Sequence, residues 1–230
     1  MKRTNIFTDG DSWLNRGLSR LFDILLLGLI TMVLCVPVIT AGAAITANMD
    51  IMLQCALKKD SKIFKRYFRV FAKNFPKATL IWLIFLIVGI LIIGAVVVTL
   101  GGFLTMDSTV RVIAAILSLI MLVLYGFAFA YVFALQSRYE NPIGTTILNA
   151  ILISLSNMPR SILMFGMTVV LAVLGYFFIG LLPLFILIEL SFVTYFSAKL
   201  MVPVLAKLGD REAAGEDPEE FTAPFERSEE

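Results

Sequence analysis

Long runs of apolar residues dominate the pattern along this chain. Three of them contain no charged residue at all: Ala78–Met106, Val112–Ser137 and Ser161–Ile188. A helix needs about 20 apolar residues to cross the hydrocarbon core of a bilayer, which is about 30 Å thick. Each of the first two runs is therefore predicted to cross a membrane once. The third run continues through Glu189 to Ala198 and can cross twice, with a turn at Gly180 and Pro183.

An earlier apolar segment is divided by Pro37. We expect two short helices, Leu21–Val36 and Ala43–Leu57, joined by a turn through residues 40–42. The positions of lysine and arginine favour this hairpin, because cytoplasmic loops are enriched in them. With six spans, all of the 19 basic residues except Arg111 fall on one side. That side is then the cytoplasm, and both termini lie there. A single crossing in this segment, which gives five spans in all, is the alternative.

The composition agrees with a membrane protein. Hydrophobic residues make up 59% of the 230 residues and charged residues 16%, whereas soluble domains carry about 25% charge. The predicted fold is all-α: a polytopic transmembrane bundle of six hydrophobic helices over residues 1–208. An acidic cytoplasmic tail over residues 209–230 is predicted to be disordered.

A basic amphipathic helix is predicted on the cytoplasmic surface, between the second and third spans. Four phenylalanines recur there at helical spacing and fall on one face: Phe64, Phe68, Phe71 and Phe75. The opposite face carries the cations Lys62, Lys65, Arg66, Arg69 and Lys73. Such a helix can anchor the chain to anionic lipid. The alternative is a docking face for a cytoplasmic partner.

Two similar short segments precede long apolar runs. Asn74-Phe75-Pro76 stands before the third span, and Asn157-Met158-Pro159 stands before the fifth. Asparagine can cap a helix, and proline is tolerated in the first turn of one. We therefore expect a new helix to begin at each segment. A surface helix followed by a two-span hairpin would then occur twice in the chain.

Residues able to perform chemistry are sparse. The chain has no histidine, which removes the commonest metal ligand and general base. It also lacks the phosphate-binding, zinc-protease and serine-hydrolase motifs. We expect a non-enzymatic protein without a cofactor, a metal or a nucleic-acid partner. The lipid bilayer is the partner that the pattern requires, and the pattern does not specify an oligomeric state.

Some polar residues are nevertheless predicted to lie within the membrane: Asn48, Asp50, Gln54 and Glu189. Ionisable groups at this depth are costly and often mark ion or substrate paths. If Asp50 and Glu189 converged on a polar cavity, the protein would be a small transporter or channel. The structural alternative for each acid is a carboxyl group that is hydrogen-bonded to a neighbouring helix.

The segment Pro37-Val38-Ile39-Thr40-Ala41-Gly42, followed by Thr46 and Ala47, resembles the YesL family of bacterial membrane proteins. A second likeness is the run Phe64, Phe68, Phe71 and Asn74, which leads into Ala78-Thr79. The family has no established activity, but its members are often encoded beside carbohydrate-uptake ABC transporters. The resemblance therefore implies the bacterial cytoplasmic membrane, ABC transporter subunits as partners, and an accessory or scaffold role.

Cysteine-accessibility labelling tests the six-span orientation. Cysteines placed at Ser61, Asn141 and Ser228 should react only from the cytoplasmic side, because all three positions lie in segments assigned to the basic side. A cysteine placed at Asp107 should react from outside. An N-terminus found outside the membrane, together with residue 62 inside, would instead establish five spans.

Overall fold

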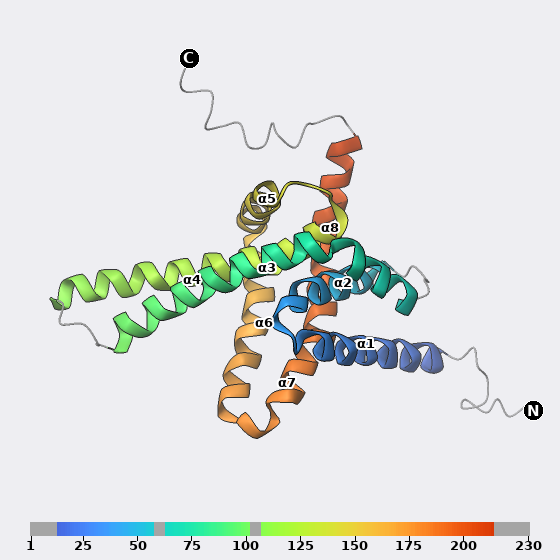
Figure 1. Ribbon diagram of the computed structural model, residues 1–230, viewed down its shortest axis with the longest axis horizontal. Coiled ribbons are helices and arrows are strands. Elements are labelled where there is room, and N and C mark those ends of the chain that lie inside the picture. Colours follow the sequence, from blue (N-terminus) through green and yellow to red (C-terminus); the bar gives the residue numbers. More distant parts are fainter. Residues whose placement is uncertain (1–12, 58–62, 102–106, 214–230) are drawn as a thin grey trace, which may run out of the picture.

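The computed structural model describes residues 13–57, 63–101 and 107–213, and every regular element within these ranges is helical (Figure 1). The elements, in chain order, are α1 (Trp13–Cys35), α2 (Val38–Ala56), α3 (Ile63–Gly101), α4 (Ser108–Arg138), α5 (Ile143–Ser156), α6 (Met158–Phe177), η1 (Ile179–Leu181), α7 (Leu182–Ile188), η2 (Glu189–Val193) and α8 (Thr194–Ala213). η1 is a 3₁₀ turn and η2 is a π-helical turn. The predicted all-α class is confirmed.

Several of these helices are long and apolar enough to cross a membrane. Within the described residues there are five such stretches: Val38–Ala56, Ile63–Gly101, Ser108–Arg138, Met158–Phe177 and Ile179–Gly209. α1 packs beside α2 and adds a further apolar helix, which exposes Phe22, Leu29 and Val33. Together α1 and α2 form the predicted hairpin, and the polytopic helical bundle is confirmed.

The turn between α1 and α2 is tighter than predicted. Only Val36 and Pro37 separate the two helices, and residues 40–42, which were expected in the turn, belong to α2. The Thr40 hydroxyl explains the early start of α2. It donates to the Pro37 carbonyl at 2.9 Å and also to the Leu34 carbonyl of α1. One side chain thus satisfies carbonyl groups on both sides of the turn.

α2 is the centre of the fold. From residue 41 to residue 54 every side chain except that of Ile45 is buried, and the helix contacts α1, α3, α4 and α8. α3 approaches α2 very closely at Gly42. A Cβ atom added there would lie 2.4 Å from the Ala78 carbonyl oxygen and 2.5 Å from the Cβ of Trp82. Glycine is therefore required at this position so that the two helices can pack.

α3 is one continuous helix, whereas the sequence predicted a separate surface helix that ends before Pro76. Pro76 lies inside α3, although a proline within a helix removes a hydrogen bond and costs about 3 kcal/mol. Contacts with α2 on both sides of the proline hold the helix together. The Tyr67 hydroxyl donates to the Ala44 carbonyl at 3.3 Å, and Thr79 Oγ1 donates to the Ile39 carbonyl at 3.1 Å.

The second predicted helix boundary is correct. α5 ends and α6 begins at Asn157, whose Oδ1 accepts a hydrogen bond from Arg160 Nη1 at 3.1 Å. No helix begins at the corresponding Asn74, which lies inside α3. The side-chain amides do not explain the difference, because each donates to the carbonyl four residues earlier, Asn74 to Val70 at 3.1 Å and Asn157 to Ile153 at 3.0 Å. The two similar segments therefore fold differently, one continuous and the other broken.

Two long hairpins extend from the centre in different directions (Figure 1). α3 and α4 form one of them, joined by ring contacts among Phe85, Tyr125 and Phe129. α6 and the broken helix α7–η2–α8 form the other. α4 and α6 meet where the Phe165 ring lies in the space left by Gly126. Further out, both hairpins expose apolar side chains, as surfaces that face lipid do.

The C-terminal helix continues past the expected start of the acidic tail at residue 209, because α8 ends at Ala213. The remainder of the predicted tail, residues 214–230, lies outside the described residues. Lys62 of the predicted basic face also lies outside them.

The close approach of α3 to α2 predicts opposite effects for one substitution at two glycines. Gly42→Ala should lower the stability of the protein in detergent by about 1–3 kcal/mol, because the backbone of α3 must move away. Gly94→Ala should raise it by about 0.5–1 kcal/mol, since nothing lies within 4 Å of the added atom and alanine is the better helix former. Thermal unfolding of the purified variants measures both. Equal effects at the two positions would show that Gly42 is not a packing constraint.

Candidate functional site

A buried carboxylate joins three helices at one end of the bundle. Asp50 of α2 has a side chain that is 2% exposed, and Arg66 of α3 binds it through two nitrogen atoms. Arg66 Nε lies 2.7 Å from Oδ2, and Nη2 lies 3.3 Å from Oδ1. Arg138, in the last turn of α4, approaches the same carboxylate, with Nε 3.6 Å from Oδ1. One acidic residue therefore pairs with two basic residues.

Gln54, one turn after Asp50 on α2, belongs to the same set of contacts. With its amide oxygen turned toward Arg138, that oxygen accepts hydrogen bonds from Nη1 at 3.2 Å and from Nη2 at 3.1 Å. α2 thus presents two acceptors, spaced i and i+4 on one face, to guanidinium groups from α3 and α4. We call Asp50, Gln54, Arg66 and Arg138 the arginine cluster.

The arginine cluster has an excess positive charge. Moving a carboxylate out of water costs several kcal/mol, and only close partners with good hydrogen bonds offset that cost. The arginine side chains remain 37% exposed at Arg66 and 26% exposed at Arg138. Their inner nitrogens can therefore hold Asp50 while the outer part of each guanidinium reaches water or lipid headgroups. This arrangement suits a junction between helices at the surface of the membrane.

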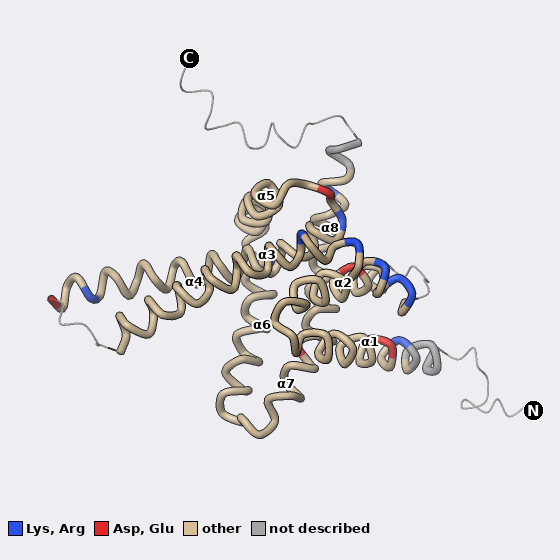
Figure 2. Tube along the Cα trace, viewed as in Figure 1, with Lys and Arg blue, Asp and Glu red and all other residues tan. Residues whose placement is uncertain are grey.

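Further polar contacts surround the cluster. Gln136 Nε2 of α4 donates to Asn74 Oδ1 of α3 at 3.3 Å. Lys73 pairs with Glu140, and the hydrogen bond from Lys73 lowers the pKa of the Glu140 carboxyl below its usual value. This last pair is exposed, so it contributes little to stability. Figure 2 shows that the basic residues of α3 gather at the same end of that helix as these contacts.

Glu189 lies in a different polar site, where the last span is interrupted. It is the first residue of the π-helical turn η2, and its Oε1 accepts a hydrogen bond from Thr168 Oγ1 of α6 at 2.8 Å. Its Oε2 is buried without a hydrogen-bond partner in the described part of the chain. π-helical turns occur frequently at functional sites. Glu189 therefore remains a candidate functional acid.

Asn48 fastens this turn to α2. Its Nδ2 donates at 2.7 Å to the Leu190 carbonyl, which lies in the turn where the regular i to i+4 bonding of the helix is interrupted. Ser191, in the same turn, lies against Gly28 of α1. A Cβ atom added at Gly28 would be 1.9 Å from the Ser191 hydroxyl oxygen. Both α1 and α2 thus hold the π-helical turn in place.

The two candidate acids have separate partners. Asp50 is bound in the arginine cluster, and Glu189 is bound to Thr168. Among the described residues no hydrogen bond or ion pair joins one acid to the other. α2 reaches both sites because Asn48 and Asp50, two positions apart, point in directions about 160° apart around the helix. The structure therefore connects the two polar sites through α2 and keeps their side chains on different faces.

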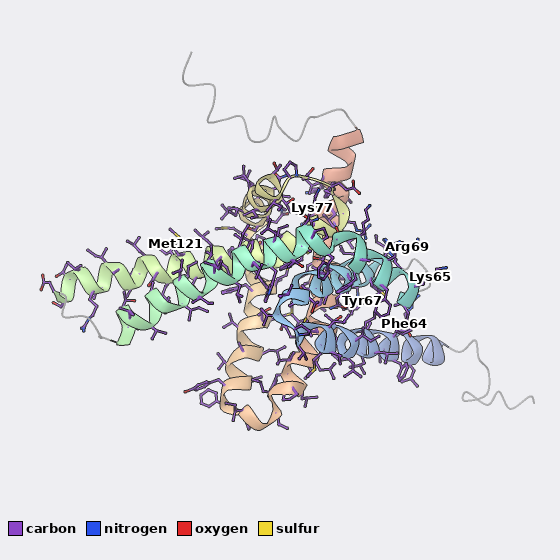
Figure 3. The ribbon with its side chains drawn as sticks, viewed as in Figure 1. Phe64, Lys65, Tyr67, Arg69, Lys77 and Met121 are labelled. Carbon is purple, nitrogen blue, oxygen red and sulfur yellow. The ribbon has the colours of Figure 1, made fainter. Side chains whose placement is uncertain are left out.

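At the beginning of α3, aromatic and basic residues are exposed together, whereas the sequence predicted that they lie on opposite faces of the helix. Phe64 and Phe68 are exposed, as are the cations Lys65, Arg69 and Lys73. Figure 3 shows Phe64, Lys65 and Arg69 near the start of the helix, with Tyr67 on the side toward the bundle. We call the five exposed residues the basic–aromatic surface: Phe64, Lys65, Phe68, Arg69 and Lys73.

Three other residues of this segment face inward. Arg66 turns to Asp50, and the Phe71 ring packs against the core. Tyr67 is fully buried, with its hydroxyl 3.1 Å from Thr31 Oγ1 of α1. Arg66, a predicted surface residue, therefore belongs to the interior junction.

The residues that carry the resemblance described above have structural roles. Pro37 and Thr40 form the turn between α1 and α2, and Gly42 admits α3. Thr46 Oγ1 donates to the Gly42 carbonyl at 2.8 Å, and Asn74 accepts from Gln136. Gly42 thus lies where α2 meets α3, the Thr46 bond lies within α2, and the Asn74 bond joins α3 to α4.

Apolar spans, exposed apolar surfaces and a central helix whose polar groups bond to its neighbours define a multi-pass helical membrane protein. Residues 21–107 match the model of the family described as Protein of unknown function, DUF624. The match covers less than half of the chain and includes Asp50 and Arg66, but neither Arg138 nor Glu189. No curated protein matches the chain, and no solved structure does.

The arginine cluster predicts a large loss of stability when its acid is neutralised. Asp50→Asn should lower the free energy of unfolding by about 3 kcal/mol, because two guanidinium groups lose their counter-charge at a buried position. Denaturant or thermal unfolding in detergent measures this loss. A double-mutant cycle with Arg66→Gln should give a coupling of about 1–3 kcal/mol. Glu140→Gln is the matched control and should change little, because its ion pair is exposed. If Asp50→Asn and Glu140→Gln lowered the free energy of unfolding equally, the arginine cluster would not be the interaction that joins the helices.

Proposed function

We propose that this protein is an accessory or scaffold subunit, without enzymatic activity, that associates with a carbohydrate-uptake transporter in the bacterial cytoplasmic membrane. The observation that carries the proposal is the use of the buried polar groups. Asp50 and its arginines join α2, α3 and α4, and Asn48 fastens the last span to α2. Because these buried polar groups bond one helix to another, they favour a structural role for the protein over a catalytic one. The resemblance to the YesL family supplies the class of transporter.

The basic–aromatic surface is the part of the molecule best suited to meet a partner. Phe64 and Phe68 are 40% and 52% exposed beside Lys65, Arg69 and Lys73. Aromatic residues and arginine are enriched at protein interfaces, because they combine a large apolar area with directional polar groups. Arg69 is the residue expected to give specificity, since it can bind a carboxylate with two nitrogens. Arg66 cannot serve in this way while it holds Asp50.

The proposed orientation places this surface and both termini on the cytoplasmic side. The basic residues at the start of α3 lie at one end of the α3–α4 hairpin, and its far tip carries only Arg111 and Asp107 among the described charged residues (Figure 2). Cytoplasmic segments are enriched in lysine and arginine, which favours the basic end as the inner one. A cytoplasmic or membrane-surface partner would then reach the basic–aromatic surface directly.

A small transporter or channel is the second candidate. Glu189 favours it, because its Oε2 atom is buried without a hydrogen-bond partner among the described residues. The atom lies at a π-helical turn within a stretch that is long and apolar enough to cross a membrane. Unpaired acids at membrane depth are costly and often lie on ion or proton paths. In this reading Glu189 carries the function alone, because Asp50 is bound in the arginine cluster.

Photo-crosslinking in native membranes tests the accessory role. A photoreactive residue placed at Lys65 or Phe68 should give an adduct with a subunit of a carbohydrate ABC transporter, identified by mass spectrometry. The same residue at Leu117, which is exposed on the apolar part of α4, is the matched control and should give lipid adducts only. Arg69→Lys should reduce recovery of the transporter by about tenfold, because lysine cannot replace a bidentate contact.

Two results together would exclude docking: lipid adducts alone at Lys65, Phe68 and Leu117, and recovery of the transporter that does not change with Arg69→Lys. Membrane anchoring would then be the role of the basic–aromatic surface. An ion or proton flux in reconstituted vesicles that is abolished by Glu189→Gln would then establish the second candidate.

A further inference from the structure

The α6–α7 hairpin ends in a turn that has no charged side chain. The run Ser161–Ile188 contains none. Tyr176, Phe177 and Ile179 at the turn are 80%, 73% and 75% exposed. Large apolar side chains that are exposed to this degree need an apolar environment, because each one left in water loses about 1.5–3 kcal/mol of burial energy.

The tip of the α3–α4 hairpin has the opposite character. Asp107 stands at the start of α4, where its Oδ1 accepts from the Ser108 N–H at 3.1 Å. Arg111 follows one turn later, and both residues are exposed. A charged cap of this kind belongs in water or among headgroups, because its charges would be costly in hydrocarbon. The two hairpin tips are therefore built for different surroundings.

The two hairpins also differ in length. α4 rises about 40 Å between Arg111 and Arg138, whereas α6 rises only about 26 Å between Arg160 and Phe177. The return from Leu182 to Lys199 is also about 26 Å. The hydrocarbon core is about 30 Å thick, and the headgroup regions extend it to about 40–45 Å. By residue count both arms of the α6–α7 hairpin can cross the hydrocarbon core. With Arg160 and Lys199 held among the headgroups of one surface, however, the part of each arm beyond them is too short to reach water on the other side, and any tilt shortens its reach further.

Part of the backbone of the short turn is hydrogen-bonded within the hairpin. The Phe178 N–H donates to the Leu174 carbonyl at 2.9 Å, and the Leu181 N–H donates to the Phe178 carbonyl at 2.8 Å. The Leu182 N–H is bonded to the Ile179 carbonyl, and Pro183 has no N–H group. Irregular backbone is tolerated at membrane depth only where its polar groups are satisfied. The first of these bonds closes the end of α6, and the other two are the 3₁₀ bonds of η1.

We propose that the turn formed by residues 177–182 stays inside the outer leaflet of the membrane and that its surroundings are lipid acyl chains. The α6–α7 hairpin then enters and leaves the bilayer on the basic side, while the α3–α4 hairpin crosses completely. Lipid is the occupant indicated by the uncharged run, the short helices and the bonded backbone together. The choice of leaflet rests on the orientation proposed above, but the burial of the turn in lipid does not.

Single cysteines at the two tips test this placement in the full-length protein, with Cys35 and Cys55 replaced by alanine. Gly180→Cys is sterically tolerated because nothing lies within 4 Å of an added Cβ atom. Ser108→Cys is the matched control on the exposed charged tip. A membrane-impermeant maleimide added to intact cells should label position 180 about tenfold less than position 108, because a thiol in the bilayer neither ionises readily nor meets the reagent.

A second measurement identifies what surrounds the turn. The same cysteines are labelled with bimane in detergent and returned to phosphatidylcholine vesicles. Bimane at position 180 should be quenched by lipid that carries a nitroxide on its acyl chain and not by aqueous iodide, and bimane at position 108 should show the reverse. Stronger quenching of position 180 by iodide would overturn the proposal, as would labelling equal to that of position 108.

Protection of position 180 from both quenchers would show that protein covers the turn, which also overturns the assignment of lipid. If position 108 reacts only in inside-out vesicles, the proposed orientation fails. The comparison of positions 180 and 108 in those vesicles then still decides whether the turn is buried.

Discussion

The pairing of Asp50 with two arginines is the interaction on which the rest of the structure depends. Taking a carboxylate out of water, as in this 2% exposed side chain, costs several kcal/mol unless cations bind it closely. Arg66 must therefore stand at the first turns of α3 and Arg138 at the last turn of α4, both beside α2. Once these ends are joined, the directions of the α3–α4 hairpin and of α2 are coupled. Gly42 and Tyr67 then complete the contact between α2 and α3.

The parts of the fold that depend on the thickness of the membrane were predictable from the sequence. The thickness of the hydrocarbon core fixes the length of an apolar run, so the long spans could be identified directly. Pro37 and the distribution of basic residues identified the hairpin of α1 and α2. Pro76 gave a wrong boundary because local propensity was outweighed by contacts with α2 on either side of it. No rule of local sequence distinguishes Asn74 from Asn157, and their neighbours in space decide the outcome.

The candidate site was predictable only in part, for a different physical reason. Asp50, Asn48, Gln54 and Glu189 stood out because polar residues are rare in apolar helices. Their partners could not be assigned, since Asn48 bonds to Leu190 at a distance of 142 positions along the chain. Arg66 was misplaced because the spacing of the phenylalanines puts it on the opposite, cationic face of an amphipathic helix, which is predicted to face the cytoplasm or the headgroups. Beside lipid the outer face of a helix is apolar as well, so hydrophobic periodicity no longer separates inside from outside.

The order in which the chain is synthesised gives the arginine cluster a consequence for biogenesis. Asp50 leaves the ribosome before Arg66, and both precede Arg138 by the whole length of the α3–α4 hairpin. Until those arginines arrive, α2 carries an unpaired acid, which disfavours its transfer into lipid. α2 can therefore settle in the bilayer only together with the helices that follow it. The acid that locks the finished bundle also makes the insertion of its first four helices a single cooperative event.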